Sequence, residues 1–277
     1  MRREKFDFVV GIGSACIASQ ALRDAGLQYA SYPFDWMSGP TFGQRIQTVC
    51  SGFEGWFRRE DLEFAGNPNG FTHDSYRNRV TNALYPHDFE IGRPFDESYP
   101  LAKAKYDRRI DRMYASIRRS GRVLVVWLEN PSDDDRPLDE EVMEARRALC
   151  AKFPSVLIEF LIIDRAKDGE RNGEVVRREY GWRATCGYRK KTALGASARP
   201  WDLEVGPIVA ILRRFVAKDW RTRAERRQYR KSERMKTYAT LNARCGLDYL
   251  LAKIQVKLCR HLEKRLRRRG IELTEGT

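Results

Sequence analysis

The chain alternates short runs of consecutive apolar residues with longer segments of helical periodicity. The apolar runs are residues 6–11, 122–129 and 155–164. Strands that are apolar on both faces are typical of a sheet that helices cover on both sides. Because helical segments separate these runs, their order predicts a mostly parallel sheet with right-handed crossovers. We therefore predict an α/β fold, specifically a Rossmann-like three-layer sandwich.

The periodicity also predicts where the remaining elements lie. The expected helices are residues 15–25, 42–59, 101–120, 138–152 and 202–215, and short strands are expected within residues 175–188. Residues 64–100 contain several prolines and are expected to be irregular. We predict one α/β domain over residues 1–215, with residues 30–100 inserted over the carboxyl ends of the strands. Ligands bind beside those ends in such sheets.

Positive charge is concentrated in the last part of the chain. Residues 216–277 contain 18 basic and 7 acidic residues, and the whole chain has a net charge of +14. From Gly246 on, apolar residues recur at steps of three and four, which predicts a basic amphipathic α-helical tail. Two placements are open for residues 246–269. They lie on an anionic membrane surface, where each basic residue contributes about 1 kcal/mol, or they pack on the body or on another subunit.

Composition disfavours several classes of protein. No stretch reaches the roughly 18 to 20 apolar residues of a membrane span, so we expect a cytoplasmic chain, peripheral at the inner membrane face if the tail binds there. Six cysteines without a C-x-x-C pair and only three histidines offer no zinc spacing, so neither a metal nor a cofactor is expected. Nucleic-acid binding is disfavoured because the main body is nearly neutral and lacks a recognition motif. The oligomeric state is left open.

Cys16 is the first candidate for chemistry. It follows the first apolar run and a glycine-rich turn, at the predicted first turn of a helix. There the helix dipole and unpaired backbone N–H groups favour a thiolate. The same position suits a phosphate, which Gly13 and Ser14 would hold through their backbone. The alternative is that Cys16 is a small buried packing residue.

A cysteine nucleophile needs a base, which is usually a histidine. Of the three histidines, His87 is favoured because aromatic and acidic residues flank it. A structural, hydrogen-bonded histidine is the alternative. Asp35 or Asp88 would orient the ring. Because neighbouring side chains of a strand point apart, the adjacent Asp88 is the weaker candidate and Asp35 is favoured.

Two further groups of charged residues follow. Arg108 and Arg112 share a face of a predicted helix and could clamp a phosphate or carboxylate, so we expect a substrate with an anionic group. The alternative is a solvated face on which aspartates pair with the arginines. The aspartates at 133–135 follow a predicted strand and suit either Mg²⁺ on a sugar nucleotide or the cap of the next helix.

Five short segments, in the same order along the chain, carry a resemblance to a known family. They are Phe6-Asp-Phe-Val-Val-Gly-Ile-Gly-Ser-Ala-Cys16, Ala21-Leu-Arg-Asp-Ala-Gly-Leu27, Ser31-Tyr-Pro-Phe-Asp-Trp36, His87-Asp-Phe89 and Arg108-Arg-Ile-Asp-Arg112. Over residues 5–165 the chain resembles a bacterial family of unknown function labelled putative papain-like cysteine peptidase. The resemblance implies that Cys16 is the nucleophile and His87 its partner. Asp35 lies in the family's Pro-Phe-Asp-Trp motif. The label also implies a cysteine at a helix start and a histidine on an antiparallel sheet, which differs from a Rossmann-like core.

Two functional interpretations follow. In the first, the chain is a papain-like cysteine hydrolase or acyl transferase in which His87 takes the proton of Cys16. In the second, it transfers a glycosyl or phosphoryl group from a phosphate-activated donor. Members of the family also resemble proteins encoded among bacterial surface-polysaccharide genes, which implies a role in polysaccharide biosynthesis. There the glycine turn and the two arginines would hold the donor, and Cys16 would be a packing residue.

Overall fold

A mostly parallel sheet forms the centre of the protein in the computed structural model, which describes residues 3–13, 16–67, 73–129, 135–166, 172–187 and 206–231. The sheet has the order β2-β6-β7-β9-β8. Its strands are β2 (Phe8–Gly11), β6 (Arg122–Leu128), β7 (Leu157–Arg165), β8 (Val175–Arg178) and β9 (Gly181–Cys186). β2, β6, β7 and β9 run parallel, and β8 is antiparallel to β9. The predicted α/β fold with a mostly parallel sheet is confirmed.

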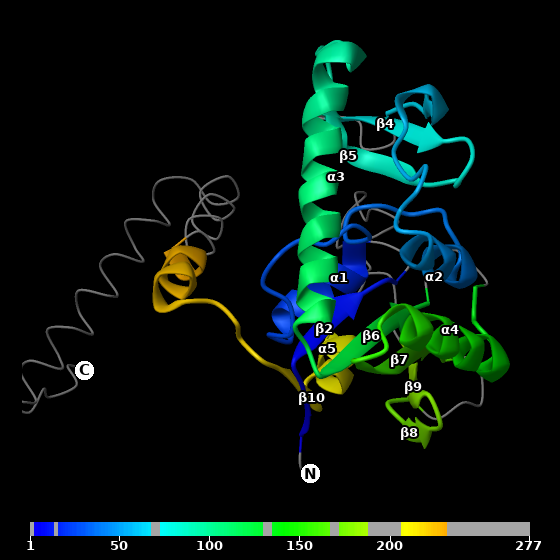
Figure 1. Cartoon of the computed structure of the whole chain (residues 1–277), viewed down its shortest axis with the longest axis vertical. Coiled ribbons are helices and arrows are strands. Elements are labelled where there is room, and N and C mark those ends of the chain that lie inside the picture. The colour runs from blue at the N-terminus through cyan, green and yellow to red at the C-terminus, as the bar shows by residue number, and fades with distance from the viewer. Residues whose placement is uncertain are drawn as a thin grey trace, which may run out of the picture. The chain divides into compact units, whose positions relative to one another are not determined.

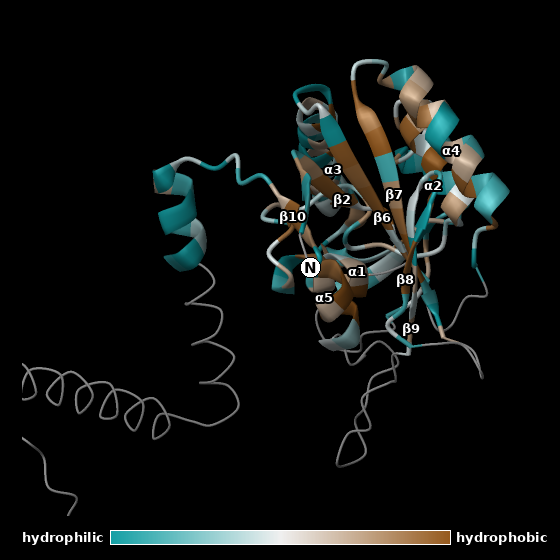
Figure 2. Ribbon diagram, turned by 90° about the horizontal axis from the view of Figure 1, so that it is seen from below, coloured by the Kyte–Doolittle hydropathy of each residue, from teal (hydrophilic) through white to brown (hydrophobic). Residues whose placement is uncertain are grey.

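Helices cover both faces of this sheet (Figure 2). Alternate residues of β6 show the reason: Val123 and Val125 belong to one buried cluster, and Leu124 and Val126 belong to another. The first cluster contains residues of α2 (Phe42–Cys50), α3 (Phe95–Arg118) and α4 (Asp139–Lys152). The second contains residues of α1 (Cys16–Asp24) and α5 (Gly206–Leu212). The continuous apolar run of this strand therefore reflects burial on both faces.

A second, antiparallel sheet lies beside the N-terminal half of α3 (Figure 1). It consists of β3 (Leu62–Phe64), β4 (His73–Asn78) and β5 (Leu84–Glu90), in that order. The prediction that residues 64–100 are irregular was wrong for β4 and β5. Their sequences are rich in polar residues, and β5 contains Pro86, which a strand tolerates at the edge of a sheet.

Some helix boundaries also differ from the predicted ones. α2 ends at Cys50 instead of residue 59, because Gly52 and Phe53 turn the chain with φ of +82° and +61°. α3 begins at Phe95 and continues through Pro100, whereas the prolines suggested a later start. α5 is shorter than predicted at its C-terminal end, where β10 (Phe215–Ala217) begins and pairs with β1 (Glu4–Phe6).

The chain divides into two compact units, Met1–Lys218 and Asp219–Thr277. In the second unit the described residues include a helix over 223–231, which begins with a capping box between Thr222 and Glu225. The rest of the predicted basic tail, including residues 246–269, lies outside the described residues. Among the residues that the structure describes, no helix is long and apolar enough to cross a membrane.

Candidate functional site

The junction between β2 and α1 brings Cys16 to the carboxyl end of the parallel sheet. Close packing against backbone requires glycine at position 13, and the Leu22 side chain crowds position 11. A Cβ atom on Gly13 would lie 2.8 Å from the backbone nitrogen of Leu128, and one on Gly11 would lie 2.8 Å from Cδ1 of Leu22. Ser14, the other half of the predicted phosphate cradle, lies outside the described residues. The structure therefore gives these glycines a packing role, and the cradle stays a prediction.

Cys16 is the first residue of α1 and is half-buried. Burial raises the pKa of its thiol above the ordinary value, while the backbone N–H groups of Cys16 and Ile17 lower it. These N–H groups belong to the first turn of the helix, where no carbonyl of the same helix accepts from them. The resting sulfur is therefore a half-buried thiol with backbone donors directed at it.

Arg45 anchors this junction from α2, and the sequence analysis did not identify it. Its side chain is fully buried, donates from Nη1 to the Gly13 carbonyl over 2.8 Å and donates from Nε to the Pro40 carbonyl over 2.9 Å. The guanidinium also faces the rings of Phe34 and Trp127, each 5.6 Å away. An arginine in a short amphipathic helix suggests a solvated face, so the pattern carried no signal of this role.

Asp35 is buried, with 3% of its surface exposed, and binds its own loop. Its Oδ2 accepts a hydrogen bond of 2.7 Å from the Tyr32 backbone N–H and one of 2.6 Å from Nε2 of Gln28. The Arg23 guanidinium of α1 lies 3.9 Å from the same oxygen. Burial raises the pKa of Asp35 to about 6, although these partners act in the opposite direction.

His87 is exposed on β5 and faces two aromatic rings. Its ring centroid lies 6.1 Å from that of Trp36 and 6.4 Å from that of His73, both edge to face. Desolvation by the surrounding atoms lowers the pKa of His87, whereas the neighbouring Asp88 raises it. The Arg23 guanidinium lies 5.8 Å from the Trp36 ring, so Trp36 is a contact between α1 and His87.

The described residues contain neither a hydrogen bond nor an ion pair between Cys16 and His87, and the Cys–His pair stays a prediction. The predicted orienting acid also stays untested. Three side chains act electrostatically on His87: Asp88 raises its pKa, and His73 and Lys105 lower it, whereas Asp35 is not among the groups that shift it. The sequence favoured Asp35 only from the directions of neighbouring side chains in a strand.

Residues of α3 contact both the strand that carries His87 and the loop that carries Asp35. Tyr106 donates a hydrogen bond of 2.8 Å to Oδ2 of Asp88, and Lys105 forms an ion pair with the same carboxylate. One turn further along, Arg109 faces the Tyr106 ring at 5.2 Å and lowers the pKa of Asp35. α3 therefore links the strand of His87 with the loop of Asp35.

The two arginines of the predicted anion clamp, Arg108 and Arg112, lie in different environments. Arg112 donates from Nη1 to the Ser31 carbonyl over 2.8 Å and so binds the same loop. Arg108 is exposed. The aspartate Asp107 pairs with Lys103, at 2.7 Å, instead of with an arginine of its own face. The structure assigns Arg112 a contact within the protein, and anion binding by the two arginines stays a prediction.

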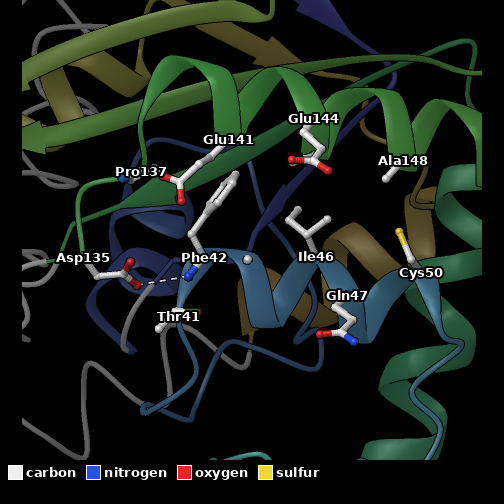
Figure 3. Close-up of a pocket in the computed structure, with 12 residues that line it drawn as sticks. Thr41, Phe42, Ile46, Gln47, Cys50, Asp135, Pro137, Glu141, Glu144 and Ala148 are labelled. Carbon is white, nitrogen blue, oxygen red and sulfur yellow. Dashed lines mark hydrogen bonds between the residues drawn. The ribbon is translucent and has the colours of Figure 1, made fainter.

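A groove of about 560 Å³ lies between α2 and α4 (Figure 3). Phe42 and Ile46 of α2 face Glu141 and Glu144 of α4 across it, and Cys50 lies at its far end. At the other end, Oδ2 of Asp135 accepts from the Phe42 backbone N–H over 3.0 Å and caps α2. The sequence suggested that the aspartates at 133–135 cap the next helix, α4, whereas Asp135 binds the start of α2. Asp133 and Asp134 lie outside the described residues. Of the residues considered for chemistry, Asp135 lines the groove, whereas Cys16, Asp35 and His87 do not.

A search for metal-binding clusters and three comparisons with known proteins complete the description of the site. Within the described residues, no group of three or more His, Cys, Asp or Glu side chains could hold a metal ion. A family model described as "Putative papain-like cysteine peptidase (DUF1796)" matches residues 7–163, which include Cys16, Asp35 and His87. No match was found among the curated proteins or among the solved structures.

Proposed function

We propose, because the chain belongs to the family described as "Putative papain-like cysteine peptidase (DUF1796)", that it is a cysteine-dependent hydrolase with Cys16 as its nucleophile. The observation that carries the proposal is the position of Cys16 at the start of α1, with the backbone N–H groups of Cys16 and Ile17 directed at its sulfur. A helix start of this kind supplies donors for a developing negative charge without any rearrangement of the chain.

In the proposed reaction, Sγ of Cys16 attacks the carbonyl carbon of an ester, thioester or amide. The thiol proton passes to a base, and the base returns it to the leaving group as the carbon–heteroatom bond breaks. Water then attacks the thioester carbon and gives one proton to the base. As the C–S bond breaks, the acid is released and the base returns this proton to Sγ of Cys16. Because burial raises the pKa of the resting thiol, proton removal must accompany attack, and the thiolate does not form beforehand.

His87 is the proposed base. Cys16 begins a helix and His87 lies on an antiparallel sheet, and these are the two placements that the family label implies. Its lowered pKa keeps the imidazole neutral at pH 7, which is the form that accepts a proton. We propose Asp88 as the acid that stabilises the protonated ring, since its charge raises the pKa of His87. Asp35 receives a different role below.

The remaining sequence-based expectations are kept as proposals of lower rank. Helices on both faces of the sheet support a Rossmann-like core. Acyl transfer would need only an acceptor other than water at the thioester. Transfer from a phosphate-activated donor has less support, because Arg112 is bound to the Ser31 carbonyl. Membrane contact by residues 246–269, a cytoplasmic location and a role in polysaccharide biosynthesis also stay proposals.

Hydrolysis by matched variants tests the proposal. Wild type, Cys16→Ser and Cys50→Ser are assayed against chromogenic esters, thioesters and peptide amides. Cys50 is a suitable control because it is also half-buried and lies at the end of a helix. We expect Cys16→Ser to lose at least about 10³-fold in kcat/KM, and Cys50→Ser to keep wild-type activity. Equal activity in all three proteins would exclude the proposal for these substrates.

A further inference from the structure

Three buried polar atoms near the α1 face of the site have no hydrogen-bond partner among the described residues: Oε1 of Gln28, Oδ1 of Asp35 and Nη1 of Arg109. Gln28 and Asp35 are 1% and 3% exposed. An unpaired buried polar group destabilises a protein, because it loses its hydrogen bonds to water and gains none in return. Three such atoms in one place need a common explanation.

The orientation of the Gln28 amide is fixed by its neighbours. Its Nε2 donates to the Ala30 carbonyl over 2.9 Å and to Oδ2 of Asp35 over 2.6 Å. Both hydrogens of the amide are thereby used, and flipping the group would place Oε1 against two acceptors. Oε1 therefore lacks a donor, while Oδ1 of the adjacent carboxyl group lacks one as well.

One proton on Asp35 satisfies both oxygens. We propose that Asp35 is held as a carboxylic acid that forms a two-bond pair with the Gln28 carboxamide, in which Nε2–H donates to Oδ2 and Oδ1–H donates to Oε1. When Asp35 loses this proton, the second bond is lost, and the unpaired Nη1 of Arg109 becomes the donor for Oδ1. The third unpaired atom is thereby explained as the partner of the ionised form.

The charged and titratable groups that face Asp35 come from three elements. Arg23 approaches from α1, Arg109 from α3, and Tyr32 lies in the same loop. Both arginines favour the ionised form, and burial opposes them and has the larger effect. The raised pKa of Asp35, about 6, agrees with a carboxylic acid that exchanges its proton in the physiological range.

The pair lies close to the helix of Cys16. Nε2 of Gln28 is 3.5 Å from Oγ of Ser19, which lies three residues after Cys16 on the same face of α1. Nη2 of Arg23, one further turn along, donates to Oγ of Ser31 over 2.9 Å. Asp35 is therefore a positioning residue that fastens the site loop to α1, and this role does not depend on the chemistry of Cys16.

The sign of the pH effect follows from the raised pKa. The folded state binds the proton of Asp35 more tightly than the unfolded chain does, for which the ordinary value is 3.8. The stability contributed by this group is fully present at low pH and is lost as the pH rises through about 6. Asp35→Asn keeps both donors and acceptors of the acid form, because its Nδ2 donates to Oε1 of Gln28.

Difference infrared spectroscopy and thermal unfolding of the full chain test the proposal. We expect a carboxylic-acid C=O band at pH 5 that is present in wild type, absent in Asp35→Asn and lost from wild type by pH 8. The Tm of Asp35→Asn minus that of wild type should rise over this interval. Arg109→Met should move the midpoint of the band to higher pH, and Arg109→Lys should restore it in part.

Two outcomes would overturn the inference. The first is an infrared spectrum in which Asp35 is already a carboxylate at pH 5, with no carboxylic-acid C=O band. The second is an Asp35→Asn protein whose Tm falls further below that of wild type as the pH rises. Because neither readout involves hydrolysis, a failed assay of Cys16 leaves this test unaffected, and the two proposals can fail separately.

Discussion

The region around Cys16 and the region around His87 are constructed in different ways. At the β2–α1 junction the thiol meets backbone donors, and the buried Arg45 binds the backbone carbonyl of Gly13. Around His87, side chains determine the environment: Asp88 raises the pKa of the ring, and α3 holds Asp88 through Tyr106. The comparison suggests that the backbone determines the position of the nucleophile, while α3 tunes the charge of the base. Each region can therefore be changed separately.

The largest expected effect belongs to the Cys16 region. Arg45→Met should lower the free energy of unfolding by about 3 to 5 kcal/mol, because two buried carbonyl groups lose their donor and the space beside two aromatic rings is refilled imperfectly. Urea denaturation measures this change. The matched control is Arg108→Met on the exposed face of α3, which should stay within about 0.5 kcal/mol of wild type. Similar losses in both variants would contradict the anchoring role of Arg45.

The next effect belongs to the His87 region and separates the two candidate acids. Asp88→Asn removes a charge that raises the pKa of His87, so the pKa should fall further, by about one unit or less. An NMR titration of the His87 ring follows this shift. Asp35→Asn serves as the control and should leave the titration unchanged. If Asp35→Asn lowers the pKa and Asp88→Asn does not, Asp35 is the orienting acid after all.

The smallest expected effect concerns the loop that joins the two regions. Arg112→Ala loses the hydrogen bond to the Ser31 carbonyl, so we expect a loss of about 1 kcal/mol in the free energy of unfolding.

Arg108→Ala is the matched variant, because Arg108 is exposed on the same helix. Calorimetry with inorganic pyrophosphate adds a test of the predicted anion clamp. Weak binding that both substitutions abolish would favour the clamp over the structural role of Arg112.

The periodicity of the sequence was sufficient for the central sheet and for the position of Cys16. β6 and β7 are apolar along nearly their whole length because helices cover both faces, and such runs are easily recognised. The antiparallel sheet was missed because β4 is largely polar and β5 contains a proline. Neither strand shows the regular alternation of apolar and polar residues that identifies a strand in a sequence.

The site was predictable only in part, for a related reason. Cysteine and histidine are typical catalytic residue types, so the sequence alone was enough to name Cys16 and His87 as candidates. The roles of Arg45, Gln28 and Arg109 depend on partners far along the chain or on burial, and residue type alone carries no sign of either. The glycines before Cys16 suggested a phosphate cradle, although close packing against Leu128 explains Gly13.

The central claim is that Cys16 is the nucleophile, and detection of the covalent intermediate tests it most directly. Wild-type protein is mixed briefly with p-nitrophenyl acetate, quenched in acid and analysed by peptide mass spectrometry. The account predicts a thioester on Cys16 that forms during the burst of p-nitrophenol, decays on dilution and exceeds acetylation of Cys50 and Cys150. Acetylation spread evenly over the cysteines, or absent from Cys16 while turnover continues, would contradict it.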